Sequence, residues 1–313
     1  MKLGAADYFH KPGMNEQEIE EALAKIKDEL EIGSQDAKET PGRAAQVHSR
    51  EAMVRNLLHG NPDGIGQTKL REAGLYVMMF SIRQYALVVK RYTKNNASIL
   101  PNTVMSIVSE LLSKENEVEF AQIDDNLYSV VISHSETRSA QASFSHVNDI
   151  VYLISSSLKR FVNIDAVIGV SSSFQSFQEA KQAAWQARQA LEQKFYHPND
   201  PLFYYQHRTG NDEQTLEQAN AYIVGMKKRP KGREIRGICY NLAEWEQYLR
   251  DTECMNEKDV KKIYEGLLFM LENGEDYLET RSRMEEIEDF GELSAFYHSV
   301  FNKSSRPGFT TKK

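Results

Sequence analysis

The feature that most constrains the fold is an uninterrupted apolar run, Leu75–Ile82, whose single polar residue is Ser81. A run of this length, rich in aromatic and β-branched residues, is typical of a β-strand. Alternation of polar and apolar residues would indicate a strand with one solvent-exposed face, but neither face of this run is polar. We therefore expect a strand that is buried on both faces of a sheet.

Strands and helices alternate after this run. The predicted elements are a helix at 102–114, strands at 117–123 and 127–133, a helix at 143–161, a strand at 166–171, a helix at 177–195 and a strand at 202–205. Asp124-Asp125-Asn126 joins the second and third strands as a tight hairpin turn. The order βαββαβαβ predicts a single α/β domain with a split βαβ arrangement around a central hairpin.

Helical segments flank this domain, and clusters of turn residues at 60–64 and 196–201 mark its two ends. Apolar residues recur at helical spacing on both sides of the domain. They predict helices at 15–30 and 44–58 before it, and at 213–226, 233–250, 257–272 and 289–301 after it. The fold class is therefore α/β with helical flanks.

Composition excludes several classes of protein. A hydrophobic share of 41% is sufficient for a packed core, whereas a net charge of −7 argues against a general nucleic-acid coat protein. Cys239 and Cys254 form neither a C-x-x-C pair nor a disulfide framework, and they fit a reducing compartment. Without an apolar run of about 18 residues or a signal peptide, we expect a cytoplasmic chain with no membrane partner.

Several candidate sites lack the partners that their chemistry needs. Gly64-Ile65-Gly66 has no preceding strand and no third glycine, so it is not a dinucleotide loop. The eight histidines show no i,i+3 or i,i+4 pairing, which argues against a metal site. Serines at 155–157 and 171–173 have no base placed beside them in the pattern. We therefore expect no metal, no cofactor and no catalytic residue among them.

Two further features leave alternatives open. The segment 227–236 holds six basic residues in ten and fits either a phosphate-contact patch or a solvated turn with cations near a helix C-terminus. Aromatic residues at helical spacing in the last third fit either a packed core or a small-ligand pocket. They are Tyr222, Tyr240, Trp245, Tyr248 and Tyr264.

The opening residues Gly4–Pro12 resemble the end of a bacterial response-regulator receiver domain, where the fifth strand ends in a Lys-Pro pair and a last helix follows. Tyr8–His10 would be that strand and 16–30 that helix. The resemblance implies that Lys11 is a vestigial receiver switch lysine, because in the family this lysine contacts a phosphorylated aspartate. That aspartate, its acidic metal ligands and the switch Ser/Thr are expected upstream of Met1, so we expect Lys11 to be idle here.

The middle segment is similar to the degenerate GGDEF-like domain of YesN-type response regulators of the AraC family, and to that of PucR/CdaR-type regulators. Ile168–Ser171, followed by Glu179-Ala180, Ala183 and 187–191, matches the last strand and helix of that domain. The segment 50–60 looks like the helix that precedes it. The implied divisions are a receiver remnant at 1–31, a helical linker at 32–64, the GGDEF-like domain at 65–206, an all-helical linker region at 207–303 and a disordered tail at 304–313.

An active GGDEF cyclase needs glycines in the central hairpin for close approach to GTP phosphates, and acidic residues that bind metal and activate the 3′-hydroxyl. The hairpin here, 122–128, has no glycine. Asp124 and Asp125 are adjacent, so they would diverge on a continuing strand, and the pattern favours a turn held by Asx hydrogen bonds. The inhibitory R-x-x-D motif is also absent, because 118–121 reads Val-Glu-Phe-Ala. We expect no enzymatic activity.

The resemblance implies a non-enzymatic, homodimeric region that carries a signal in a two-component transcriptional response regulator. Intact relatives have a sensor histidine kinase and promoter DNA as partners. We expect neither partner for this chain, because the phosphoacceptor and the helix-turn-helix units of the family are not found in it. A nucleotide or cyclic-dinucleotide sensor of cyclase type, and a metabolite-sensing domain of PucR type, remain as alternatives.

Overall fold

The computed structural model describes residues 41–92, 99–135, 139–206, 212–227, 235–271 and 275–304. The chain divides into two units, 1–49 and 50–313. In the first unit the structure describes only the beginning of helix α2 (Pro41–Leu58), which continues into the second. The expected receiver strand, Lys11, the helix at 15–30 and the tail at 305–313 lie outside the described residues.

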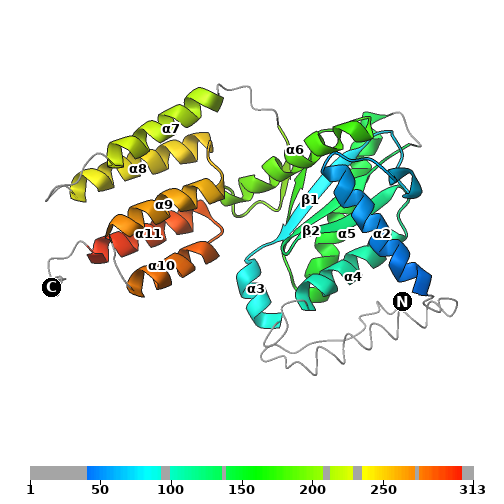
Figure 1. The fold of residues 1–313 in the computed structure, drawn as a ribbon, viewed down its shortest axis with the longest axis horizontal. Helices are drawn as coiled ribbons and strands as arrows, with labels where there is room; N and C mark the ends of the chain where they lie inside the picture. The colour runs from blue at the N-terminus through cyan, green and yellow to red at the C-terminus, as the bar shows by residue number, and fades with distance from the viewer. Residues whose placement is uncertain are drawn as a thin grey trace, which may run out of the picture. The chain divides into compact units, whose positions relative to one another are not determined.

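Five strands form one sheet in the order β2-β3-β1-β4-β5. Figure 1 labels β1 and β2 of this sheet. The strands are β1 (Tyr76–Ile82), β2 (Val118–Asp124), β3 (Leu127–Ile132), β4 (Ala166–Val170) and β5 (Leu202–Tyr204). Neighbouring strands are antiparallel except for β4 and β5, which are parallel. Strand β1 is central and all seven of its residues are buried, so the strand predicted from the apolar run is confirmed.

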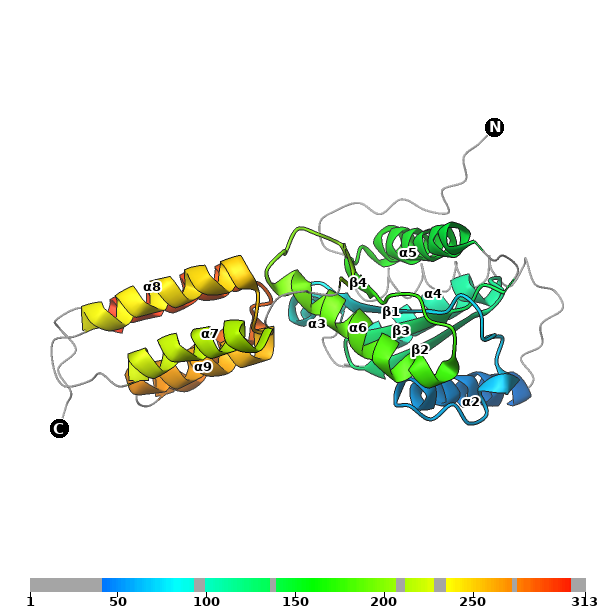
Figure 2. The ribbon, with the colours of Figure 1, turned by 90° about the horizontal axis from the view of Figure 1, so that it is seen from above.

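Helices cover both faces of the sheet (Figure 2). Alternate residues of β1 point to opposite faces. Met78 and Phe80 pack with α3 (Tyr85–Tyr92), α4 (Ile99–Ser113) and α5 (Ala140–Val162) on one side. Val77 and Met79 pack with α2 and α6 (Ala180–Glu192) on the other. Burial on both faces explains why β1 contains almost no polar residue.

Helix α6 packs against β4 at very short range. A Cβ atom placed on Gly169 would lie 2.3 Å from the carbonyl oxygen of Ala187 and 2.4 Å from the amide nitrogen of Leu191. The inner face of α6 carries small residues, namely Ala180, Ala183, Ala184, Ala187 and Ala190. The alanine-rich sequence therefore sets a close helix–strand contact that only a glycine at 169 permits.

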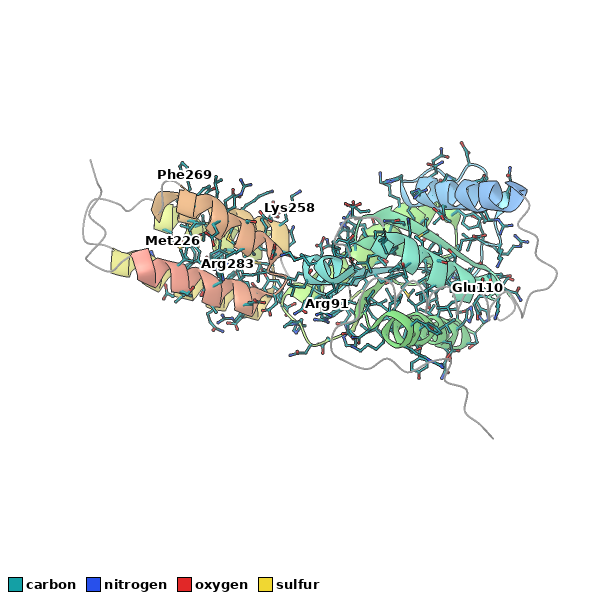
Figure 3. All side chains as sticks on the ribbon, turned by 90° about the horizontal axis from the view of Figure 1, so that it is seen from below. Arg91, Glu110, Met226, Lys258, Phe269 and Arg283 are labelled. Atoms are coloured by element: carbon teal, nitrogen blue, oxygen red, sulfur yellow. The ribbon has the colours of Figure 1, made fainter. Side chains whose placement is uncertain are left out.

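The last third of the described chain is entirely helical, with its own core. It contains α7 (Asp212–Lys227), α8 (Ile235–Thr252), α9 (Glu257–Leu271), α10 (Glu275–Glu286) and α11 (Phe290–Ser304). We call residues 212–304 the helical segment. Met226 is buried in its core, whereas Phe269 on α9 is exposed, and both are labelled in Figure 3. Trp245 and Tyr264 are also fully buried, with ring centroids 5.6 Å apart.

The predicted α/β fold class and the βαββαβαβ order are confirmed, and the structure adds two helices to those predicted. Helix α3 was not expected from the sequence, and neither was α10. The helix predicted at 177–195 consists of α6 between two short 3₁₀ turns, Phe177–Glu179 and Gln193–Phe195. In the part of the chain that the structure describes, no helix is both long enough and apolar enough to cross a membrane.

Candidate functional site at the end of β1

The candidate site lies where β1 ends, because the central hairpin and the start of α3 meet there. The side chain of Asn126 binds both backbone groups of Ile82. Its Oδ1 accepts a hydrogen bond from the Ile82 amide at 2.7 Å, and its Nδ2 donates to the Ile82 carbonyl at 3.0 Å. One turn residue therefore fixes the hairpin to the last residue of the central strand.

The two hairpin carboxylates lie at an exposed turn. Asp124 and Asp125 are exposed, and Asp124 Oδ1 accepts the amide of Asp125 at 2.9 Å. This bond reaches the next residue, whereas an Asx turn bonds the amide two residues on, so it is not the Asx hydrogen bond that the sequence favoured. Among the described residues, no three His, Cys, Asp or Glu side chains are placed to hold a metal ion.

A cavity of about 390 Å³ lies beside the hairpin, with Tyr85, Asp125, Glu192 and Lys194 among its lining residues. Burial raises the pKa of the Tyr85 hydroxyl, and the carboxylates of Asp125 and Asp124 raise it further. Burial also raises the pKa of Glu192, against the opposing effect of Arg188. Both shifts favour the neutral form of the group.

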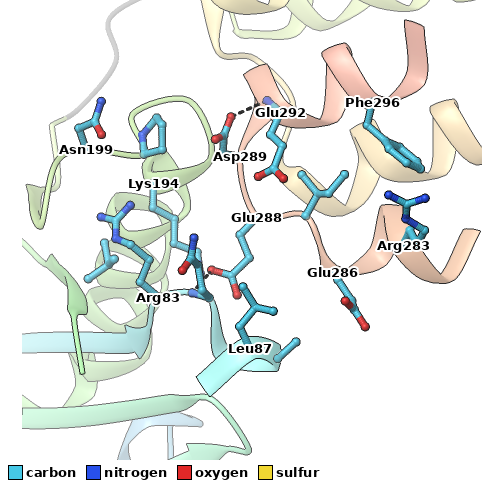
Figure 4. Close-up of a pocket in the computed structure, with 15 residues that line it drawn as sticks. Arg83, Leu87, Lys194, Asn199, Arg283, Glu286, Glu288, Asp289, Glu292 and Phe296 are labelled. Atoms are coloured by element: carbon cyan, nitrogen blue, oxygen red, sulfur yellow. Dashed lines mark hydrogen bonds between the residues drawn. The ribbon is translucent and has the colours of Figure 1, made fainter. Parts of the chain in front are cut away.

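The N-terminus of α3 is occupied by a carboxylate from the helical segment (Figure 4). Glu288 accepts the amide of Gln84 through Oε2 at 2.8 Å and that of Tyr85 through Oε1 at 3.0 Å. The free amides of a first helical turn attract anions, and a carboxylate there is favoured by the helix dipole. A residue 204 positions away thus fills an anion-binding position at the end of β1.

A second cavity of about 650 Å³ adjoins this contact. Arg83 and Lys194 line it from the α/β domain, and Asp289 and Glu292 line it from the helical segment (Figure 4). Arg83 Nη2 donates to the Asp200 carbonyl at 3.0 Å, and Lys194 Nζ donates to Ser81 Oγ at 3.2 Å. The cavity therefore combines cations from the α/β domain with carboxylates and the cation Arg283 from the helical segment.

The structure places the remaining sequence candidates in structural roles. Ser171 Oγ accepts the Val77 amide and Ser155 Oγ donates to the Val151 carbonyl, so both serines bind backbone rather than a base. Gly64 precedes a short 3₁₀ turn, Ile65–Gln67. Trp245 and Tyr264 belong to the core of the helical segment, as the simpler reading of the aromatic pattern has it. The basic residues at 228–234 lie outside the described residues.

The sequence did not identify Glu288 or Arg83. Glu288 stands in an acidic stretch between two helices, and only its spatial neighbours distinguish it from Glu285 or Glu286. Arg83 follows a strand whose end was predicted, so its place at the sheet edge was available from the sequence. No local pattern in the sequence indicated that a carboxylate distant in the chain contacts α3 next to Arg83.

No protein-family model matches this chain, and neither does any curated protein. Among solved structures it is similar to the S helix-GGDEF-EAL region of LapD from Vibrio cholerae. The form bound to c-di-GMP matches at 11% identity with a TM-score of 0.36, over 66% of this chain and 46% of that one. The apo form matches at 11% identity with a TM-score of 0.32, over 56% and 39%. This chain thus spans less than half the length of those structures.

Proposed function

We propose that this chain is a non-catalytic signal-transmission region, in which a degenerate GGDEF-like domain connects regulatory units of a protein of the YesN response-regulator type. The observation that carries the proposal is the state of the hairpin. It has no glycine, its carboxylates are exposed in a local turn, and Asn126 fixes it to Ile82. A hairpin held in this way offers neither phosphate-binding backbone nor a metal-binding pair.

The contact of Glu288 with α3 supports the same proposal. A nucleotide phosphate at this helix N-terminus would compete with a carboxylate that is already hydrogen-bonded to two amides. The same carboxylate links the α/β domain to the helical segment. The end of β1 therefore serves to join two parts of the chain, which is what transmission of a signal requires.

Turnover and binding measurements test the non-catalytic part of the proposal. Purified protein is incubated with GTP and Mg²⁺, and cyclic dinucleotide is measured by chromatography beside an active cyclase as positive control. We expect no product above the buffer blank. Titration calorimetry with GTP and with c-di-GMP is expected to show no saturable heat at ligand concentrations up to about 1 mM. A Kd of 1 mM corresponds to a binding free energy of about −4 kcal/mol, so any binding would be weaker than this.

The two measurements separate the proposal from its alternatives. Product formation would make the chain a cyclase and refute the proposal. Saturable binding of c-di-GMP without turnover would favour a cyclic-dinucleotide sensor instead. If neither nucleotide binds, the transmission role and the metabolite-sensing alternative both remain. A thermal-shift screen of small metabolites distinguishes these two, because only a bound ligand raises the Tm.

A further inference from the structure

The helical segment contacts the α/β domain in two chemically different places, and a further ion pair, from His197 Nε2 to Glu253 Oε1 at 2.6 Å, lies next to the first of them. In the first, Phe290 lies with its ring centroid 5.6 Å from that of Phe195 and 5.2 Å from that of Tyr196. The Tyr196 hydroxyl also donates to the Met255 carbonyl at 2.7 Å. We call Phe195, Tyr196 and Phe290 the aromatic pivot. Phe195 is fully buried in the core of the helical segment, so this contact belongs to a packed interior.

The second contact is polar. Glu288 accepts the amides of Gln84 and Tyr85, and Lys90 Nζ lies 2.8 Å from Glu286 Oε1. We call these five residues the polar latch. The side chains of Lys90 and Glu286 are 61% and 45% exposed, so water and ions reach this pair. The latch therefore consists of bonds that solvent can replace.

The 650 Å³ cavity has charged groups on both sides, and Arg283 adds a cation to the carboxylates of the helical segment. Arg83 and Lys194 stand on the side of the α/β domain, and Asp289 and Glu292 on that of the helical segment. Within the described residues, none of these four forms an ion pair with another across the gap. Electrostatic interactions between charges on the two sides of a solvent-filled cavity are weak and are screened by salt.

The two contacts differ in how easily they break. Separation of the pivot exposes aromatic surface that the core buries, whereas loss of the latch exchanges hydrogen bonds with protein for hydrogen bonds with water. A carboxylate at a helix N-terminus changes an equilibrium by about 2- to 30-fold, and an exposed ion pair changes it by only about 1- to 5-fold. The latch is thus the weaker of the two contacts.

We propose that the helical segment is a lever that turns about the aromatic pivot and is held closed by the polar latch. In the open state Glu288 leaves α3, so that the first amides of this helix and Arg83 face solvent. The inference rests on the proposed function, because a transmission region needs two states of similar free energy that its partners can bias.

Amide exchange in the full chain tests the lever with residue resolution. The variant Glu288→Ala removes the main bond of the latch, and Glu292→Ala is the matched control, since Glu292 lines the same cavity and its exposed side chain makes no contact in the latch. We expect Glu288→Ala to accelerate exchange at Gln84 and Tyr85 about 10-fold and to leave the amides of Tyr196 and His197 unchanged. Lys90→Ala is expected to accelerate exchange about 2-fold at the same two amides.

Small-angle X-ray scattering shows whether the lever moves or a hydrogen bond is merely lost. We expect the radius of gyration of Glu288→Ala to exceed that of the wild type. An increase in salt from 0.05 to 0.5 M shortens the Debye length about 3-fold, and we expect it to increase the radius of gyration of the wild type as well. Glu292→Ala is expected to scatter as the wild type does.

Three results would overturn the lever. These are unchanged exchange at Gln84 and Tyr85 in Glu288→Ala, equal acceleration at the latch and the pivot, or faster exchange at the latch without any change in scattering. None of these depends on nucleotides. A failed lever is therefore distinguishable from a failed non-catalytic assignment, which the turnover and binding measurements decide.

Discussion

At the scale of single residues, the chain depends on positions where one atom decides the packing. Gly169 is the clearest, because its missing Cβ lets α6 approach β4. Asn126 is a second, since its amide group satisfies both backbone groups of Ile82. Neither residue is conspicuous in the sequence. Their importance comes from what the fold brings next to them.

We predict that Gly169→Ala destabilises the protein by at least about 1–3 kcal/mol, the usual cost of overpacking, because the added methyl group meets backbone atoms that cannot rotate away. Urea unfolding measures the change. Gly66→Ala is the control, since a Cβ there has no neighbour within 4 Å. Equal stability of the two variants would show that α6 does not pack against β4 as described.

A pH dependence follows from Glu246 and His298. Burial alone would raise the pKa of Glu246, but hydrogen bonds from His298 and Tyr264 bring it below its ordinary value of 4.5. The hydrogen bond to Glu246 raises the pKa of His298 above 6.5, against the effect of burial. Stabilisation by the carboxylate is lost as pH falls through its lowered pKa. Stabilisation by the imidazolium is present below 6.5 and is lost as pH rises through the raised pKa.

We therefore predict that thermal stability declines as the pH rises from 6.5 through the raised pKa of His298, and that His298→Gln flattens this decline. The variant is expected to be less stable than the wild type at pH 6, by about 1–3 kcal/mol, because a buried carboxylate loses a charged partner. Differential scanning calorimetry between pH 5 and 9 checks both points. A variant whose stability falls as steeply above pH 6.5 as that of the wild type would rule out His298 as the source.

At the scale of secondary structure, the sequence predicts long elements well and short connecting elements poorly. Strand β1 and helix α5 were placed within a few residues, because a run of apolar residues or a 3.6-residue period is repeated over their whole length. Helix α3 was missed because it has only eight residues, and α10 because its sequence is mostly polar. The candidate site combines the end of β1 with Glu288, so its hairpin half was predictable and its distant half was not.

The hairpin is expected to depend on Asn126 in a graded way. Asn126→Asp keeps an acceptor for the Ile82 amide but loses the donor to the Ile82 carbonyl, whereas Asn126→Ala loses both. We predict that the free energy of unfolding falls by about 1 kcal/mol in Asn126→Asp and by about 2–3 kcal/mol in Asn126→Ala. Denaturant unfolding measures the series, with the exposed Asp125→Ala as control. A neutral Asn126→Ala would contradict the role of this residue in holding the hairpin to β1.

At the scale of the whole molecule, a transmission region is expected to work as a pair of chains. We predict a homodimer, because the helix expected at 15–30 has a narrow apolar stripe that one small domain does not cover. The helix expected at 44–58 no longer supports this argument, because its apolar residues Val54, Leu57 and Leu58 are buried against the sheet. Light scattering at tens of micromolar checks this prediction. A strictly monomeric mass would remove dimerisation from the proposed role.

The most direct measurement of the central claim asks whether this chain transmits a signal. The chain is fused between the receiver and the DNA-binding unit of a YesN-type regulator, and promoter output is measured with an intact receiver and with one whose phosphoacceptor aspartate is replaced by alanine. We predict output that depends on the phosphoacceptor, and no such dependence when a Gly/Ser linker of equal length replaces the chain. Output that ignores the phosphoacceptor, or that the flexible linker reproduces, would contradict it.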